Sequence, residues 1–222
     1  MNKKIIVMTP HPDDETLGCG GTLLKYKEQN HQLYWLIITG MGDNFSNERK
    51  QLRQKEIDAV AVHYQFKKVF QLNLPAAELD KIPMADLVDS ISEIFSSVQP
   101  QIVFTPYPGD IHSDHKTVFD ATMSCTKWFR YPSVEKVLVY ETLSETDFSI
   151  DPDANGFKPN IFVNISGLLD KKIEIMNIYE SEISDFPFPR SEKAIRSLAF
   201  LRGAASGFEE AEAFMLLKER IE

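Results

Sequence analysis

Short, uninterrupted apolar runs alternate with longer stretches of helical periodicity, and this alternation limits the fold of the chain more than any other feature. The first run, residues 5–8, is apolar at every position, as in a strand buried on both faces of a parallel sheet. The same reasoning predicts further strands at 33–39, 69–72, 101–105, 137–140 and 161–163. Helices are predicted at 16–29, 46–63, 87–98, 168–181, 191–202 and 209–220. This order predicts a three-layer α/β/α sandwich with a mostly parallel sheet.

Length and composition bound the class of protein. At 222 residues the chain is expected to form a single domain, 1–222, large enough for a full core. Hydrophobic residues make up 43% and charged residues 26%, which is ordinary for a globular protein. The net charge of -9 disfavours nucleic acid as a partner. The segments 40–44 and 144–159, rich in turn-forming residues, are predicted to be loops.

Several sequence features bear on the location of the protein. No apolar stretch approaches the roughly 18 residues that span a bilayer, so no membrane insertion is expected. The apolar run after Lys3 and Lys4 stops within about four residues, too short for a signal-peptide core. Cys19 and Cys125 lie far apart and form no disulfide framework, so a cytoplasmic location is expected. The sequence does not fix the oligomeric state, and a homo-oligomer stays open.

Three acids and an imidazole stand together directly after the first predicted strand, in His11-Pro12-Asp13-Asp14-Glu15. Neighbouring carboxylates repel one another, and a bound divalent cation would remove this penalty. Capping of the following helix explains one aspartate, but it does not explain the histidine beside it. The segment therefore predicts a metal site with a spare carboxylate for proton transfer.

A second cluster, His112-Ser113-Asp114-His115, follows the predicted strand at 101–105. Its two histidines are three residues apart, so one helical turn would bring them near each other. The carboxyl ends of parallel strands lie on one edge of a sheet, where ligands bind. The two clusters are therefore expected to meet at that edge, although they are far apart in sequence.

The residues of the two clusters match the ligands of a catalytic metal. His11, Asp14 and His115 supply two imidazoles and one carboxylate, a set that suits zinc with an open position. Fe(II) would accept the same set, so the sequence favours zinc without excluding iron. A cation held in this way assists the hydrolysis of an amide or an ester.

The remaining residues of the clusters supply candidates for proton transfer. Asp13 is predicted to act as the general base on a water molecule. His112, as an imidazolium, is predicted to stabilise an oxyanion or to protonate a leaving amine. Asp114 is predicted to accept a hydrogen bond from His112, which would orient the imidazole and raise its pKa.

The two clusters resemble the two signatures of the LmbE-like, or PIG-L, deacetylases. The resemblance implies a Rossmann-like fold and zinc on His11, Asp14 and His115. It implies Asp13 as general base and His112 as the charged partner of the tetrahedral intermediate. It further implies a small-molecule substrate, an amino sugar of the N-acetylglucosamine type or its conjugate, from which an N-acetyl group is removed.

Two further segments resemble the same family. Arg53-Gln54-Lys55-Glu56 is similar to a family helix whose arginine reaches the substrate, while a solvated helix face is the alternative for Arg53. Tyr179-Glu180-Ser181-Glu182 stands where relatives often carry Tyr or His followed by Ser-Gln, so glutamate replaces glutamine here. Residues 186–190 are interpreted either as a lip over the pocket or as a contact between helices. Trp35 and Trp128 are both predicted to lie in the core.

Other functions stay open on the sequence alone. An amidase that cleaves a different N-acyl group, or a thiol-sugar conjugate, would use the same clusters. A Rossmann-like nucleotide-binding protein without hydrolytic activity is supported only by Gly18, Gly20 and Gly21, which lack the full phosphate-binding motif. A metal-binding scaffold without catalysis is disfavoured by the presence of Asp13 and both histidines of the second cluster.

Overall fold

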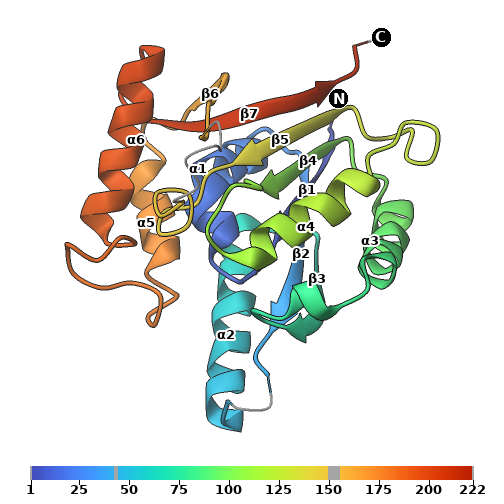
Figure 1. Ribbon diagram of the computed structural model, residues 1–222. Helices are drawn as coiled ribbons and strands as arrows, with labels where there is room; N and C mark the ends of the chain where they lie inside the picture. Colours follow the sequence, from blue (N-terminus) through green and yellow to red (C-terminus); the bar gives the residue numbers. More distant parts are fainter. Residues whose placement is uncertain (1, 43–44, 150–155, 222) are drawn as a thin grey trace.

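The computed structural model describes residues 2–42, 45–149 and 156–221, and one seven-stranded sheet forms its centre (Figure 1). The strand order is β3-β2-β1-β4-β5-β7-β6. The five strands that pair in parallel are β1 (Lys4–Thr9), β2 (Gln32–Gly40), β3 (Lys68–Pro75), β4 (Ile102–Pro106) and β5 (Lys136–Tyr140). Strand β7 (Ala211–Glu219) runs antiparallel to both of its neighbours, β5 and β6 (Ile161–Asn164). The predicted, mostly parallel sheet is confirmed.

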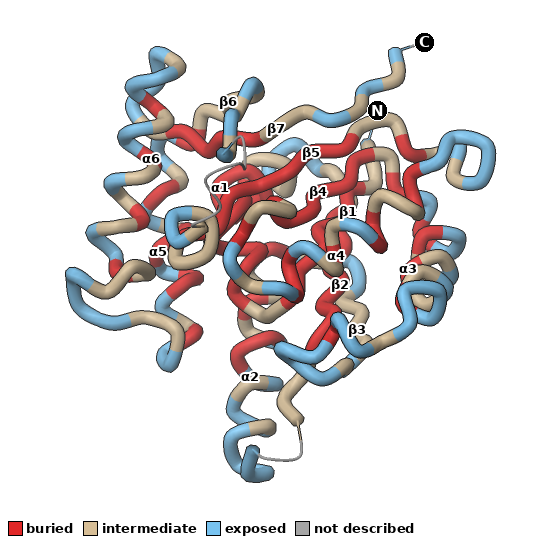
Figure 2. The backbone as a smooth tube through the Cα atoms, viewed as in Figure 1, coloured by how far each residue is buried: buried red, intermediate tan, exposed pale blue. Residues whose placement is uncertain are grey.

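Helices cover both faces of the sheet, which confirms the predicted three layers (Figure 1). One face carries α1 (Asp14–Glu28), α2 (Asn47–Tyr64), α5 (Leu169–Met176) and α6 (Glu192–Ser206). The other face carries the short helix η1 (Leu79–Lys81), α3 (Met84–Val98) and α4 (Ser113–Ser124). Figure 2 shows the buried residues concentrated in the strands and the inner sides of these helices.

Alternate side chains of β1 pack into two separate hydrophobic cores, one on each face of the sheet. Ile5 and Val7 contribute to the core under α1, whereas Ile6 and Met8 contribute to the core under α3 and α4. All four side chains are inaccessible to solvent. The uninterrupted apolar run in the sequence therefore reflects burial on both faces of a central strand.

The glycines of α1 allow this helix to approach its neighbours closely. A Cβ added at Gly18 would stand 2.2 Å from the ring of Tyr140, and one at Gly21 would stand 2.8 Å from Ile165. Such distances are sterically excluded, so these positions accept only glycine without rearrangement. The glycines serve packing, and the nucleotide-binding alternative loses the feature that supported it.

The helix predicted at 209–220 is wrong, because this segment forms β7. Its Glu, Ala, Leu and Lys residues favour a helix locally, but strand pairing on both sides overrides that preference. The side chain of Glu212 is buried, and its carboxylate lies 2.7 Å from Nζ of Lys172. The predicted helix at 168–181 also ends early, at Met176.

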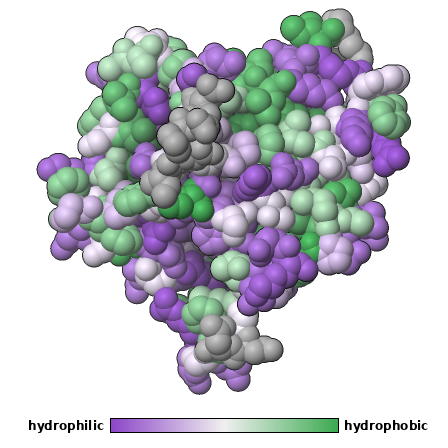
Figure 3. All heavy atoms as spheres, viewed as in Figure 1, coloured by the Kyte–Doolittle hydropathy of each residue, from purple (hydrophilic) through white to green (hydrophobic). Residues whose placement is uncertain are grey.

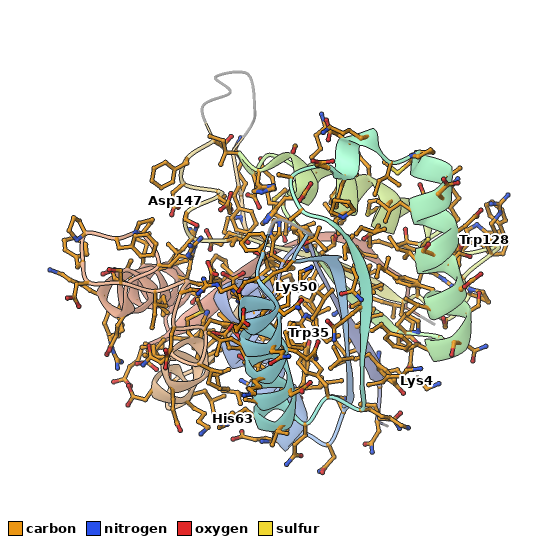
Figure 4. The ribbon with its side chains drawn as sticks, turned by 90° about the horizontal axis from the view of Figure 1, so that it is seen from below. Lys4, Trp35, Lys50, His63, Trp128 and Asp147 are labelled. Atoms are coloured by element: carbon orange, nitrogen blue, oxygen red, sulfur yellow. The ribbon has the colours of Figure 1, made fainter. Side chains whose placement is uncertain are left out.

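The two tryptophans have opposite environments (Figure 4). Trp35 is fully buried, as predicted, but Trp128 is 65% exposed, so its predicted place in the core is wrong. Figure 3 shows hydrophobic residues in several places on one face, intermixed with hydrophilic ones. None of the described helices is both long and apolar enough to cross a bilayer. Residues 43–44 and 150–155 of the two predicted loops lie outside the described residues.

Candidate metal centre

The two sequence clusters meet where the strand order reverses. From β1 the chain continues to β2 on one side, and β4 occupies the other side of β1. In an open α/β sheet the crevice at such a reversal, outside the carboxyl ends of the strands, is the usual place for a ligand. His11 follows the end of β1, and His115 stands in the first turn of α4, after β4. The predicted juxtaposition is confirmed.

His11, Asp14 and His115 bring one potential ligand atom each to a common place, with all three atoms within 4.8 Å of one another. The carboxylate of Asp14 lies between the two imidazoles. Its Oδ2 is 3.5 Å from Nδ1 of His11, and its Oδ1 is 3.5 Å from Nε2 of His115. The backbone N–H of His11 also donates to Oδ2 of Asp14, at 2.9 Å, which fixes the carboxylate. We call these three residues the donor set.

The imidazole of His115 has one satisfied nitrogen and one unsatisfied nitrogen. Its Nδ1 lies 2.7 Å from Oδ2 of Asp110, whose other oxygen accepts a hydrogen bond from the hydroxyl of Thr146. Its Nε2 is buried and has no hydrogen-bond partner among the described residues. A carboxylate at Nδ1 holds the proton there and directs the Nε2 lone pair toward a metal. The orphaned nitrogen therefore fits a cation in the donor set.

Asp110 contacts the donor set, and the sequence analysis missed it. It lies in the loop between β4 and α4, five positions before His115, and it is buried. A metal-binding histidine usually donates its other ring N–H to a carboxylate or carbonyl oxygen. That rule could have directed attention to the acid nearest the second cluster.

The acids around the donor set favour a positive charge at this place. Burial lowers the pKa of His11, but the carboxylates of Asp114 and Asp14 outweigh burial and raise it to about 10. The pKa of His115 is likewise raised, because Asp14 and Asp110 outweigh the effect of burial. An environment of acids that favours the charged form of both imidazoles also suits the charge of a divalent cation.

Asp13 occupies a strained backbone position beside the donor set. It is the N-cap of α1, with φ at 116°, a region that residues other than glycine rarely adopt. Its backbone N–H donates to Oε2 of Glu15, and the other oxygen of Glu15 accepts from the hydroxyls of Thr16 and Tyr179. Burial, Asp14 and Glu182 all raise the pKa of the Asp13 carboxyl group.

His112 makes a different contact from the one predicted. Its Nδ1 accepts a hydrogen bond from the backbone N–H of Asp114, at 3.1 Å, so the imidazole caps α4. The distance from Nδ1 to the carboxylate of Asp114 is 3.9 Å, too long for the predicted hydrogen bond. Burial and the neighbouring His11 and His115 lower the pKa of His112. Asp114 raises this pKa, as predicted, but its effect is outweighed.

The carboxylate of Asp114 is committed to other partners. It accepts hydrogen bonds from the backbone N–H groups of Ala77 and Leu79, at 2.7 and 3.3 Å. Its Oδ2 also lies 3.2 Å from Nε2 of His11. Asp114 therefore connects the segment before α3 to the donor set and orients His11 rather than His112.

A cavity of about 440 Å³ opens beside these residues. His11, Asp13, Asp14 and His112 contribute to its wall, and so does Arg53 from α2. The side chain of Arg53 is only 11% exposed, so the alternative of a solvated helix face is wrong. Other charged residues that line the cavity are Lys50 (labelled in Figure 4), Glu145, Glu182 and Arg190.

Comparisons with known proteins agree with this geometry. The PIG-L family, described as GlcNAc-PI de-N-acetylase, matches residues 6–126. The diacetylchitobiose deacetylase of Thermococcus kodakarensis is 26% identical over 226 residues, which cover 95% of this chain and 81% of that protein. A probable N-acetyl-alpha-D-glucosaminyl L-malate deacetylase 2 of Bacillus cereus is 24% identical over 192 residues, covering 82% of this chain and 84% of that protein.

A solved structure shares the fold. The N,N'-diacetylchitobiose deacetylase from Pyrococcus horikoshii superposes with a TM-score of 0.79 at 22% identity, over 97% of this chain and 84% of that one. The family match itself spans more than half of the chain and contains both sequence clusters. This chain therefore belongs to the PIG-L family of deacetylases.

Proposed function

We propose that this protein is a zinc-dependent hydrolase that removes the N-acetyl group from an amino sugar of the N-acetylglucosamine type. One observation carries the proposal. The donor set converges beside Asp13, and it includes Nε2 of His115, which is buried without a hydrogen-bond partner among the described residues. His11, Asp13 and Asp14 line a cavity there. The names of the two relatives, which act on diacetylchitobiose and on a glucosaminyl malate, support an N-acetylated sugar as the substrate.

His11, Asp14 and His115 would hold the ion. Two imidazoles and one carboxylate are a common ligand set of catalytic zinc, and Fe(II) is the alternative ion for the same donors. When bound, such an ion supplies a positive charge that acidifies water and polarises a carbonyl group. Asp110 and Asp114 would not bind the ion themselves. They orient the imidazoles of His115 and His11, which would bind it.

Asp13 is the proposed general base. Its raised pKa makes its carboxylate a stronger base than an aspartate in water, which suits removal of a proton from the attacking water. The water oxygen adds to the amide carbon, the C–N bond breaks, and the proton passes to the departing nitrogen. The products are acetate and the free amine of the sugar.

His112 is the proposed electrophilic partner in this reaction. Because its Nδ1 accepts from the backbone of Asp114, its proton stands on Nε2, available to the cavity. An N–H at that place would stabilise the negative charge that develops on the carbonyl oxygen. Its lowered pKa favours the neutral imidazole, which donates one hydrogen bond without carrying a full charge.

Elemental analysis and acetate release would test the proposal on three proteins. The wild type is expected to contain zinc and to release acetate from N,N'-diacetylchitobiose. Asp13→Asn is expected to keep the metal and lose about 10²–10⁴-fold in rate, since a general base contributes that much. Asparagine is chosen because it tolerates a positive φ better than alanine does. His11→Ala is expected to lose the metal, and full activity of Asp13→Asn would contradict the base assignment.

The ion and the acyl group need their own measurements. Activity of the chelated protein is expected to return with Zn²⁺, and a stronger recovery with Fe²⁺ under anaerobic conditions would assign iron instead. Glucosamine carrying longer N-acyl chains serves as the comparison substrate. A higher kcat/KM on those chains than on the acetyl compound would favour the amidase alternative.

A further inference from the structure

Two arginines share one glutamate in the wall of the cavity. Arg53 comes from α2, whereas Glu182 and Arg190 come from the segment between α5 and α6. Nη2 of Arg53 donates to Oε1 of Glu182, and Nη2 of Arg190 lies 3.2 Å from Oε2 of the same carboxylate. Each oxygen of Glu182 thus engages a different guanidinium group. We call these three residues the arginine–glutamate bridge.

Most N–H groups of the two guanidinium groups already have protein acceptors, whereas Nη1 of Arg53 is buried and has no hydrogen-bond partner among the described residues. Nε of Arg190 donates to the carbonyl oxygen of Glu182 at 2.8 Å, and its Nη1 donates to the hydroxyl of Ser144 at 3.1 Å. Nε of Arg53 lies 3.3 Å from the carboxylate of Glu56. Two positive charges are therefore balanced by two negative charges within the protein, and this part of the wall is close to neutral.

The bridge is largely shielded from water, which makes it hard to open. The side chains of Arg53, Glu182 and Arg190 are 11%, 23% and 20% exposed. A substrate phosphate or carboxylate that engaged these arginines would displace Glu182 and leave a partly buried carboxylate unpaired. It would also meet the negative charge of Asp13 and Glu145, two acids against the one described lysine, Lys50, that lines the same cavity. A hydroxyl group meets neither obstacle.

We infer that Glu182 is a specificity-determining residue, which selects uncharged N-acetylated sugars against sugars that carry a phosphate or carboxylate group. This inference rests on the proposed deacetylase function and narrows its substrate class. Without the carboxylate, the two guanidinium groups would become a site for an anionic substituent, since arginine binds phosphate and carboxylate groups in the same geometry.

The test compares uncharged and anionic substrates on matched variants. N-acetylglucosamine and N,N'-diacetylchitobiose are the uncharged substrates, and the 1-phosphate and 6-phosphate of N-acetylglucosamine are the anionic ones. For Glu182→Gln, the ratio of kcat/KM for the anionic to the uncharged substrates is expected to rise by at least about tenfold. Glu180→Gln, an exposed glutamate of the same segment, is the control and is expected to leave the ratio unchanged.

A binding measurement separates this inference from the proposed function. Calorimetric titration of the metal-loaded wild type and both variants with N-acetylglucosamine 6-phosphate needs no turnover. Tighter binding by Glu182→Gln alone, with no acetate released by any protein, would sustain the charge selection and refute the deacetylase. A wild type that binds or hydrolyses the phosphorylated sugars as well as the uncharged ones would overturn the inference. An unchanged ratio and unchanged affinity in Glu182→Gln would overturn it as well.

Discussion

Two buried clusters of charged residues lie against α1, and they differ in how completely their hydrogen bonds are satisfied. In the cluster of Lys172 and Glu212, the carboxylate accepts from the backbone N–H groups of Gly21 and Thr22, at 2.8 and 2.7 Å. Nζ of Lys172 donates to the same carboxylate at 2.7 Å, and to the carbonyl oxygen of Leu17 at 2.9 Å. Both charges are fully paired within the protein.

The donor set at the start of α1 is the opposite case. Three further acids, Asp13, Asp110 and Asp114, surround its single carboxylate. Nε2 of His115 has no hydrogen-bond partner among the described residues. Buried polar groups in proteins are normally satisfied, so an orphan among several acids indicates a missing ligand. Complete pairing is typical of a structural cluster such as Lys172–Glu212, whereas incomplete pairing supports the proposed metal site at the donor set.

The largest expected effect is that of His115→Ala, which should break the metal site. Activity is expected to fall by more than about 100-fold, because even the outer partners of metal ligands contribute 10–100-fold. The wild type should also unfold at a higher temperature when Zn²⁺ is added, since an ion that binds the folded state stabilises it. Elemental analysis, acetate release and thermal unfolding with and without Zn²⁺ are the measurements. A variant that keeps its zinc and its thermal response would remove the distinction between the two clusters.

Lys172→Met should give the reverse pattern. The buried carboxylate of Glu212 loses its counter-charge, so the free energy of unfolding is expected to fall by about 3–5 kcal/mol. Zinc content and kcat of the folded protein are expected to stay unchanged. Urea denaturation measures the loss, and Lys171→Met is the control, because its pair with Glu174 is on the surface. Loss of zinc from a folded Lys172→Met protein would show that the clusters are coupled.

Tyr179→Phe should give a smaller, mixed effect, because Tyr179 connects to Asp13 through Glu15. Loss of the hydroxyl is expected to lower the free energy of unfolding by about 1 kcal/mol. A less constrained Asp13 should lower kcat by about tenfold with KM unchanged, since small misplacements of reacting groups are costly. Steady-state kinetics and urea denaturation measure both effects.

Tyr64→Phe is the matched control for that prediction. Its hydroxyl is equally buried and donates to Thr16 at 3.0 Å, so it reaches Glu15 only through Thr16, whereas Tyr179 donates to Glu15 directly. It should lose similar stability and keep its kcat. Equal losses of kcat in the two variants would mean that Tyr179 supports the fold rather than the position of Asp13.

The parallel part of the fold and the donor set were predictable because their signals are local. A run such as 5–8 specifies a buried strand, and the residues that follow β1 and β4 must meet at one edge of the sheet. The rest depends on distant partners. Glu212 favours a helix by itself, and only Lys172 and the N–H groups of α1 explain its burial in a strand. The contact between Arg53 and Glu182 joins residues that are 129 positions apart.

Asp110 and Trp128 show the same limit on a smaller scale. The contact of Asp110 with His115 depends on how the loop after β4 folds back, which no periodicity in the sequence describes. Trp128 follows α4 in an irregular segment, where its hydrophobic character did not decide its environment. In both cases the residue type identifies the chemistry of the side chain, but it does not identify the residues that surround it in the fold.

At Asp13 the requirements of stability and activity conflict. The positive φ of its backbone lowers the stability of the fold, whereas its carboxylate is the proposed general base. A non-glycine residue held in such a conformation stores on the order of 1–3 kcal/mol, and its crowded carboxyl group adds repulsion. A substitution of Asp13 by glycine would relieve the backbone strain, and it would also remove the carboxylate. Selection for heat resistance alone would therefore favour an inert protein, and only demand for the reaction keeps the acid in place.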